Sequence, residues 1–242
     1  MPDRAFDVRR LAELYDPLDP DRADLEVYAD IVDELEAHIV LDVGCGTGTF
    51  ACSLALRGLE VVGVDPAAAS LDVARCKPGG DVVRWICGDT TTLPPLRVDL
   101  ATLTGNVAQV FLTDDDWLGG LSGIRAALRP DGRLVFETRD PARKAWLGWN
   151  PDQTRRTTEI PPVGRVETWC EVTEVREPLV SFRWWYRFES DGLVLTSDST
   201  LRFRERDEVE HTLRQAGFHV DDVRDAPDRP GLEFVFVASR PD

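Results

Sequence analysis

Three glycines at alternate positions follow a short apolar run near residue 40. The run Val40-Leu41-Asp42-Val43 leads into Gly44, Gly46 and Gly48, and a helical pattern begins after them. Glycine allows tight turns and lets a ligand approach the backbone without a Cβ in the way. Dinucleotide-binding proteins use a similar turn, but their G-x-G-x-x-G pyrophosphate fingerprint is not met here. The spacing therefore indicates a strand-to-helix turn that cradles a ligand and argues against a dinucleotide.

An acid, Asp42, lies two residues before the first glycine. A carboxylate at this point would repel a pyrophosphate but would attract an ammonium group, directly or through a water molecule. The ligand implied by Asp42 is therefore cationic at this end.

Alternating apolar runs and helical patterns supply the frame that positions this turn. We expect strands at 38–43, 60–64, 82–87, 98–103 and 133–138, with helices at 49–57, 66–76 and 113–128. Thr113 is a good N-cap for the last of these helices, and a turn at 129–132 follows it. Strands that are apolar on both faces and alternate with helices indicate a parallel, doubly wound sheet. Two further helices are expected before the sheet, at 5–15 and 22–37.

The pattern changes after residue 140. From 165 to 203 it has a period of two, and Glu189-Ser190-Asp191-Gly192 has the composition of a hairpin turn, which indicates an antiparallel insertion of about three strands. A helix at 206–216, ended by Gly217, and strands at 220–223 and 233–239 follow. We therefore divide the chain into an N-terminal helical lid (1–37), a core (38–140), a β insertion (141–204) and a return to the core (205–242).

Four further motifs follow the glycine turn in order. They are Val61-Val62-Gly63-Val64-Asp65, Cys87-Gly88-Asp89-Thr90, Leu103-Thr104-Gly105-Asn106 and Leu128-Arg129-Pro130-Asp131-Gly132-Arg133-Leu134. With the glycine turn, they make residues 38–139 resemble the class I (Rossmann-like) S-adenosylmethionine-dependent methyltransferases of small-molecule type. The resemblance implies an α/β fold with a doubly wound, mostly parallel seven-stranded sheet whose last strand is antiparallel. It also implies that the antiparallel β insertion after strand five is a cap over the substrate.

The resemblance further implies S-adenosylmethionine as cofactor and S-adenosylhomocysteine as product. Asp65 would accept both ribose hydroxyls, Asp89 and its neighbour would face the adenine amino edge, and the backbone after strand four would face the methionine end. The implied cofactor-binding residues are Asp42, Gly44, Cys45, Gly46, Gly48, Asp65, Pro66, Asp89, Thr90, Thr104 and Asn106.

Two residues are candidates for a catalytic role. Methyl transfer from a sulfonium displaces a good leaving group, so positioning supplies much of the acceleration, and a base is needed only where the acceptor must first lose a proton. Glu137 lies near the end of the fifth strand, where open α/β sheets present ligand-facing groups. Tyr15 resembles the N-terminal lid tyrosine of small-molecule members. The alternatives are an ordinary polar strand residue for Glu137 and a core aromatic for Tyr15.

The insertion is rich in aromatic residues and resembles the cap of small-molecule methyltransferases, including sugar N-methyltransferases. The residues are Trp146, Trp149, Trp169, Trp184, Trp185 and Tyr186. They could enclose an apolar or cationic acceptor, while core packing and a dimer face are the alternatives for most of them. Trp184 and Trp185 must point to opposite faces of one strand, so at most one of them lines a given pocket. A homodimer through this insertion is a further expectation.

The formal net charge of −16 disfavours nucleic-acid partners, because these need basic surfaces. No apolar stretch approaches the ~18 residues of a membrane helix, and the first residues lack the basic start and apolar run of a signal peptide. The five cysteines form no C-x-x-C pair and no Cys/His metal spacing. We expect a cytoplasmic protein that acts on a small molecule, with no metal, no membrane and no nucleic acid.

The expected function is transfer of a methyl group from S-adenosylmethionine to a nitrogen or oxygen of a small metabolite. A protein that binds the cofactor without catalysis is one alternative. An NAD-dependent oxidoreductase is another, disfavoured by Asp42 and by the glycine spacing. A nucleic-acid methyltransferase is disfavoured as well, because Thr104-Gly105-Asn106-Val107 stands where amino-methylating nucleic-acid enzymes carry Asn/Asp-Pro-Pro-Tyr/Phe.

Overall fold

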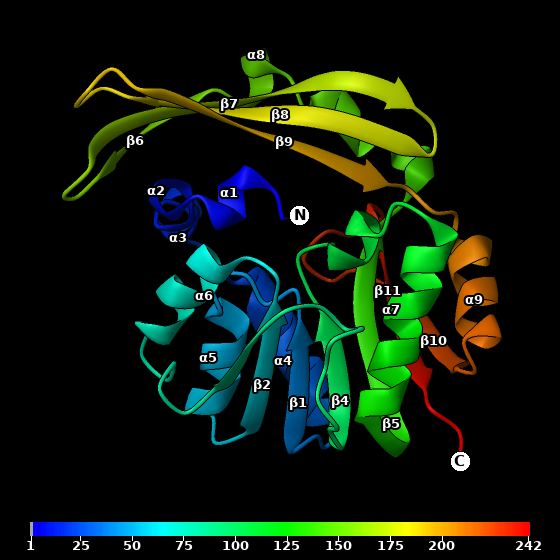
Figure 1. Cartoon of the computed structure of the whole chain (residues 1–242). Helices are drawn as coiled ribbons and strands as arrows, with labels where there is room; N and C mark the ends of the chain where they lie inside the picture. The colour runs from blue at the N-terminus through cyan, green and yellow to red at the C-terminus, as the bar shows by residue number, and fades with distance from the viewer. Residues whose placement is uncertain (1) are drawn as a thin grey trace.

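The computed structural model describes residues 2–242, and a seven-stranded sheet forms its core (Figure 1). The strand order is β10-β11-β5-β4-β1-β2-β3. The strands are β1 (Ile39–Val43), β2 (Glu60–Asp65), β3 (Arg84–Cys87), β4 (Val98–Leu103), β5 (Leu128–Arg139), β10 (His219–Asp225) and β11 (Glu233–Ser239). Neighbours among β1 to β5 are parallel, and β11 is antiparallel to both β5 and β10. The predicted doubly wound sheet with an antiparallel last strand is confirmed.

Helices cover both faces of this sheet. On one face, α4 (Asp24–Glu34) and α5 (Thr49–Leu56) contribute buried side chains to an apolar cluster with β1, β2 and β11. On the other face, α7 (Asp114–Ala127) and α9 (Arg206–Gln215) pack against β4 and β5. All six residues of β4 are buried, as expected for a central strand covered on both faces. Helix α6 (Ala68–Arg75) contacts β2 and β3.

Local sequence signals place most helix ends correctly. The Thr113 hydroxyl accepts a hydrogen bond from the Asp116 backbone N–H (3.1 Å) and caps α7, as predicted. Gly217 has a φ of 83° just after α9. The predicted start of β5 at residue 133 was wrong. Leu128 already pairs with Val98, and the predicted turn at 129–132 lies inside the strand.

The predicted helix at 5–15 is replaced by three short ones: α1 (Arg4–Asp7), α2 (Arg9–Ala12) and α3 (Tyr15–Leu18). The break falls at Val8, whose backbone is extended (φ −86°, ψ 113°). The Val8 side chain packs into an apolar cluster with the cap, so tertiary packing overrides the local helical pattern. The later part of the expected lid (1–37) forms α4, which packs on the core sheet. From here the name lid is used for residues 3–18 alone.

The cap is a four-stranded antiparallel sheet of order β6-β7-β8-β9. Its strands are β6 (Arg156–Ile160), β7 (Gly164–Arg176), β8 (Leu179–Phe188) and β9 (Val194–Arg202). The predicted hairpin turn at 189–192 joins β8 and β9. Short helical segments connect β5 to this sheet: η2 (Pro141–Arg143), η3 (Ala145–Gly148) and α8 (Pro151–Thr154). Strand β6 was not predicted, because it is a largely exposed edge without apolar alternation.

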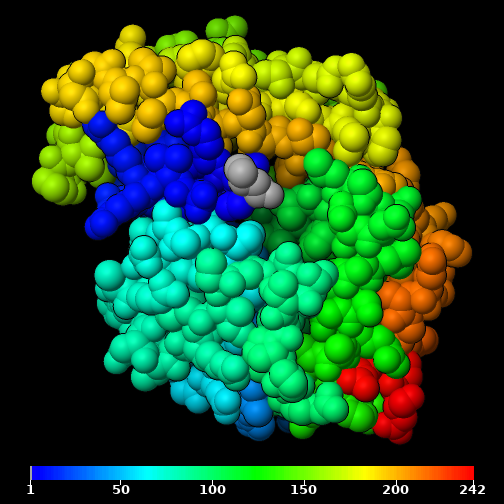
Figure 2. All heavy atoms as spheres, viewed as in Figure 1, coloured from blue at the N-terminus to red at the C-terminus, as the bar shows by residue number. Residues whose placement is uncertain are grey.

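The lid lies between the cap and the core (Figures 1 and 2). Leu11, Leu14 and Leu18 form one apolar cluster with Ile160, Val166, Tyr186 and Phe188 of the cap. On the other side, α1 and α2 contact α6 of the core. Among residues 2–242, no helix has the length and apolarity needed to cross a membrane.

Candidate active site

The three glycines of the turn after β1 serve different purposes. All three are left-handed, with φ of 69°, 52° and 75° at Gly44, Gly46 and Gly48. A Cβ on Gly44 would lie 2.6 Å from Val107, and one on Gly48 would lie 2.5 Å from Trp85. A Cβ on Gly46 would have no heavy atom of the described residues within 4 Å. Packing therefore requires Gly44 and Gly48, whereas Gly46 faces open space at the carboxyl end of β1.

Asp65, the last residue of β2, holds this turn. Its carboxylate accepts hydrogen bonds from the backbone N–H of Gly46 (2.9 Å) and of Ala67 (2.8 Å). Burial raises the pKa of Asp65, and the two N–H donors oppose that rise. The carboxylate thus fixes Gly46, the glycine that faces open space. Pro66 is exposed beside it, and Cys45 is half-buried in the turn.

Asp42 lies behind the glycine turn, inside β1. One carboxylate oxygen accepts a hydrogen bond from the Thr102 hydroxyl (3.2 Å), and the other has no partner among residues 2–242. Burial raises the pKa of Asp42 to about 7. A buried carboxylate with an unpaired oxygen is costly unless a positive charge is close. A cationic group bound at this end of the site would therefore be stabilised by Asp42.

The loop after β4 lies beside the glycine turn, because β4 pairs with β1. Gly105 and Asn106 are both left-handed (φ 74° and 62°), and a Cβ on Gly105 would meet no described atom within 4 Å. The Asn106 backbone N–H donates to Glu137 Oε1, and its side-chain Nδ2 donates to Glu233 (3.3 Å). Two carboxylates from β5 and β11 therefore hold the loop in a conformation that non-glycine residues rarely adopt.

Glu137 is buried, and burial raises its pKa to about 7. Its second oxygen, Oε2, has no partner among residues 2–242. The Tyr28 ring of α4 is buried nearby, and burial, reinforced by the charge on Glu137, raises the pKa of that phenol. In this structure the carboxylate reaches the loop backbone at Asn106, and a role as a base remains a prediction.

The loop after β3 contains the residues predicted to face adenine. Asp89 is exposed, and its Oδ1 accepts hydrogen bonds from the backbone N–H (2.9 Å) and hydroxyl (2.6 Å) of Thr91. Thr90 is buried, and its backbone is packed against Gly123 of α7, where a Cβ would lie 2.0 Å from the Thr90 carbonyl oxygen. Thr104, at the end of β4, is half-buried. These loops and the glycine turn follow the carboxyl ends of β1 to β4, the edge of the sheet where ligands bind in open α/β folds.

Tyr15 lies on the lid, with its ring centroid 5.5 Å from that of Phe6. It is 39% exposed, and burial raises its pKa. The charge of a Tyr15 phenolate would act on both Tyr186 of the cap and Arg139 of β5. Arg139 Nη1 donates to Gln109 Oε1 (2.9 Å), and burial lowers its pKa. Tyr15, Tyr186 and Arg139 thus come from three elements far apart in the sequence and are close enough for their charges to influence one another.

The two adjacent tryptophans of β8 lie on opposite faces, as predicted. Trp184 packs against the cluster that the cap shares with the lid, on the face toward the core. Trp185 stacks on Trp169 at 5.5 Å and 8° on the outer face. Trp146 and Trp149 pack with Phe203, so they belong to the base of the cap.

Sequence reasoning missed Arg139, Glu233 and Asp16. Arg139 could have been found by the rule that identified Glu137, because it ends the same strand. Glu233 and Asp16 act through contacts with residues 127 and 31 positions away, for which the sequence offers no local signal. Among residues 2–242, no group of three His, Cys, Asp or Glu side chains has the arrangement of a metal site.

Comparison with known proteins bears on this part of the chain. Residues 40–132 match the methyltransferase domain family, and these residues run from β1 into β5. They are therefore similar to methyltransferase domains, and the fold of the chain is that of a solved S-adenosylmethionine-dependent methyltransferase from Clostridium acetobutylicum. The matched residues include the glycine turn, Asp65, the loop after β3 and the loop after β4.

Curated relatives and a solved structure agree with this assignment. The domain is similar to the cypemycin N-terminal methyltransferase of Streptomyces sp (33% identical, 45% of this chain and 44% of the relative). It is also similar to the ubiquinone biosynthesis O-methyltransferase of Idiomarina loihiensis (32% identical, 51% of this chain and 56% of the relative). The chain thus spans about half the length of these relatives.

The solved sugar N-methyltransferase KedS8 of Streptoalloteichus sp has the same fold over the whole chain. It superposes with a TM-score of 0.75 over 100% of this chain and 95% of its own, at 16% identity. At this identity the likeness concerns the fold, which extends beyond the methyltransferase domain to the lid and the cap.

Proposed function

We propose that the chain transfers a methyl group from S-adenosylmethionine to a nitrogen or oxygen of a small molecule. The observation that carries the proposal is the crevice between Gly46 and Gly105, two left-handed glycines on facing loops whose missing side chains leave open space at the carboxyl edge of the sheet. Asp65 lies on one side of this crevice, and the buried charge of Asp42 lies behind it.

The residues present fit this cofactor. Each Asp65 oxygen uses one lone pair on a backbone N–H and retains capacity for a ribose hydroxyl. Asp42 supplies the negative charge that an ammonium or a sulfonium requires. A Cβ at Gly46 would occupy the space into which the cofactor would fit, which gives this glycine a function that packing does not explain.

Bound S-adenosylmethionine would supply a methyl group on a good leaving group. The chain itself then needs to orient the acceptor, exclude water and, for a protonated acceptor, remove a proton. For the first two tasks we propose an acceptor recess between Tyr15, Tyr186 and Arg139, because these polar side chains come from the lid, the cap and the end of β5, and the lid packs against the cap. We infer that the acceptor is held there, and the charge of −16 favours a small molecule over a nucleic acid.

Thermal unfolding with S-adenosylmethionine, S-adenosylhomocysteine and NADH tests the proposal. A ligand at 100 times its dissociation constant adds about 2.7 kcal/mol, or about 5–10 °C for a chain of this size. We expect this shift with the two adenosyl-sulfur ligands and none with NADH. A shift with NADH alone would indicate an oxidoreductase, and cofactor binding without product across a panel of acceptors would indicate a non-catalytic binding protein.

Tyr15→Phe tests the acceptor recess. The change removes one hydroxyl from a 39% exposed side chain, so we expect the KM for the acceptor to rise about fivefold, the effect of roughly 1 kcal/mol. The melting temperature and the cofactor Kd should stay within error. Ser239→Ala is the control, because it also removes one hydroxyl, which donates to Asp221 (2.9 Å), but at the end of β11 that pairs with Arg133, away from the carboxyl edge of the sheet, so it should leave the acceptor KM unchanged. Equal acceptor kinetics in wild type and Tyr15→Phe would contradict this placement.

We also propose that the outer face of the cap joins two copies of the chain. This face carries the Trp169–Trp185 stack, with Arg155 4.4 Å above Trp169. Charged residues of this face pair within it: Arg155 and Arg187 with Glu167, and Arg183 with Asp198. An aromatic surface whose charges are paired would suit self-association. Sedimentation equilibrium should give twice the chain mass of 27.1 kDa, and a monomer at micromolar concentration would refute the dimer.

A further inference from the structure

The lid is held by its two neighbours in different ways. Toward the cap it buries Leu11, Leu14 and Leu18, and Arg10 lies 3.7 Å over the Phe188 ring. Toward the glycine turn of the core it presents one charged side chain, Asp16 of α3. Toward the cap the lid is thus attached largely by apolar packing. Toward the core it is attached by this polar cluster at the proposed cofactor site and by contacts of α1 and α2 with α6, where Ser70 Oγ donates to the Phe6 carbonyl oxygen (2.7 Å).

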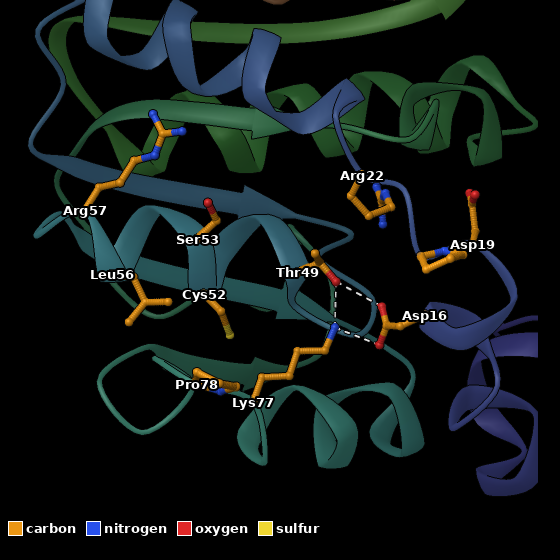
Figure 3. A pocket seen from close by; sticks show the side chains of 11 residues that line it. Asp16, Asp19, Arg22, Thr49, Cys52, Ser53, Leu56, Arg57, Lys77 and Pro78 are labelled. Atoms are coloured by element: carbon orange, nitrogen blue, oxygen red, sulfur yellow. Dashed lines mark hydrogen bonds and ion pairs between the residues drawn. The ribbon is translucent and has the colours of Figure 1, made fainter. Parts of the chain in front are cut away.

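The polar cluster consists of Asp16, Thr47, Thr49 and Lys77. Figure 3 shows three of them, Asp16, Thr49 and Lys77. Asp16 Oδ1 accepts hydrogen bonds from the hydroxyls of Thr47 (2.9 Å) and Thr49 (3.0 Å). Lys77 Nζ lies 2.8 Å from Asp16 Oδ2, and it donates to Thr49 Oγ1 (2.6 Å) and Thr47 Oγ1 (3.2 Å). The ammonium therefore uses all three of its donors inside the cluster.

These contacts act on the backbone of the glycine turn. Thr47 directly follows Gly46, the glycine that faces open space, and Thr47 and Thr49 flank Gly48. With both hydroxyls fixed by Asp16, the peptide units between Gly46 and Thr49 lose freedom to rotate. Charge-assisted hydrogen bonds are about twice as strong as neutral ones, so one carboxylate on the lid restrains a turn 31 residues away in the sequence.

Water reaches this cluster from a groove of about 530 Å³ beside α5, which is lined by Asp16, Thr49, Cys52 and Lys77 among others. The Asp16 and Lys77 side chains are 27% and 20% exposed. An ion pair in such a position is stable but is opened more easily than an apolar interface, because water can replace its contacts. The contact between the lid and the glycine turn is therefore open to replacement by water, whereas the leucines that join the lid to the cap are buried.

We propose that Asp16 is a positioning residue that couples closure of the lid to the shape of the glycine turn, and so sets how long the cofactor stays bound. This inference rests on the proposed function for its cofactor. The lid remains with the cap through its leucines, and the break occurs between Asp16 and the two threonines. Lid opening then releases Gly46 and its neighbours, and the cofactor exchanges.

Asp16→Asn and Lys77→Met are the test variants. Each removes one charge from the cluster, and we expect the dissociation rate of S-adenosylhomocysteine, measured by surface plasmon resonance, to rise about tenfold. Lys77→Arg should restore slow dissociation. Thr49→Val should act like Asp16→Asn, whereas Thr49→Ser, which keeps the hydroxyl, should behave like the wild type.

Arg10→Gln is the matched control. It breaks an ion pair of the same lid with Asp191 of the cap (2.7 Å) and leaves the glycine turn alone. We expect a loss of thermal stability similar to that of Asp16→Asn but an unchanged dissociation rate. If Arg10→Gln speeds dissociation as much as Asp16→Asn, loss of lid stability explains the effect and the coupling is refuted.

Hydrogen exchange in ligand-free protein separates this inference from the proposed function. Asp16→Asn should speed amide exchange at 44–49 as well as in the lid, whereas Arg10→Gln should speed it in the lid alone. If S-adenosylhomocysteine does not bind but exchange at 44–49 responds to Asp16, the coupling stands and the proposed function falls. If it binds and neither its dissociation nor exchange at 44–49 responds to Asp16→Asn, the function stands and the coupling falls.

Discussion

Asp65→Ala is expected to weaken S-adenosylmethionine binding by about 100-fold. The carboxylate is the proposed acceptor for both ribose hydroxyls, and two charge-assisted hydrogen bonds at roughly 1.5 kcal/mol each amount to about 3 kcal/mol. The same carboxylate also accepts hydrogen bonds from Gly46 and Ala67, so its loss also frees the turn that faces the cofactor. Isothermal titration with the cofactor and its product measures the change.

Asp99→Ala is a close control for this variant. Asp99 is also 8% exposed and also accepts two backbone hydrogen bonds, from His38 (2.8 Å) and Ile39 (3.0 Å), but at the amino end of the sheet. Both variants should lose similar stability, about 1–3 kcal/mol, because each leaves two N–H groups without their acceptor. Only Asp65→Ala should lose cofactor affinity. Equal affinities for the two variants would show that Asp65 does not bind the ribose.

Asp42→Asn is expected to change stability and cofactor affinity in opposite directions. At pH 8 the folded wild type carries a buried negative charge with one unpaired oxygen, and the asparagine removes that charge at nearly constant shape. We expect the free energy of unfolding at pH 8 to increase by about 2 kcal/mol, within the range that such a pKa difference allows. The cofactor Kd should rise at least about tenfold, since the cationic ligand loses its attraction to the site.

The pH dependence of stability follows from the direction of the shift. Burial raises the pKa of Asp42 to about 7 in the folded state, while in the unfolded chain it lies near its ordinary value of 3.8. Between these values the folded state binds more protons than the unfolded one, so the contribution of Asp42 to stability decreases as pH rises from about 4 to 7 and is constant above. Denaturant titrations at pH 5 and pH 8 should show a smaller difference for Asp42→Asn than for wild type. Glu137 contributes a decrease of the same sign, because its pKa is also raised to about 7.

An unchanged or lower stability of Asp42→Asn at pH 8 would contradict the buried-charge argument. It would mean that the unpaired oxygen is compensated in solution, for example by a bound water. Higher stability combined with unchanged cofactor affinity would instead separate Asp42 from the cofactor. The two measurements on one variant therefore test the electrostatics and the site independently.

The sequence was most informative where the signal was local. The Thr113 cap, the Gly217 stop and the 189–192 hairpin depend on residues within a few positions of one another, and all three are present. The parallel sheet was predictable because apolar runs and helices alternate with little interruption. The glycine turn was recognisable because its spacing is itself the signal.

The parts that were not predictable depend on distant partners. Val8 breaks the first helix because the cap packs against it. Strand β6 forms because its backbone hydrogen-bonds to β7. Asn106 follows β4 and is held by Glu137 of β5 and Glu233 of β11. No pattern along the sequence indicates that these three residues meet. The sequence predicted which loops would face the cofactor, but only the tertiary structure shows which side chains hold those loops in shape.

The position of the lid between cap and core has a consequence for how the protein is made. The leucines of the lid leave the ribosome early, but their apolar partners lie on β6, β7 and β8, which are synthesised much later. Until the cap emerges, these leucines remain available to chaperones or to other nascent chains. A chain arrested before β8 would therefore expose the lid leucines and would also lack β10 and β11 of the core sheet, and the yield of protein in cells should depend on how quickly translation passes through the cap.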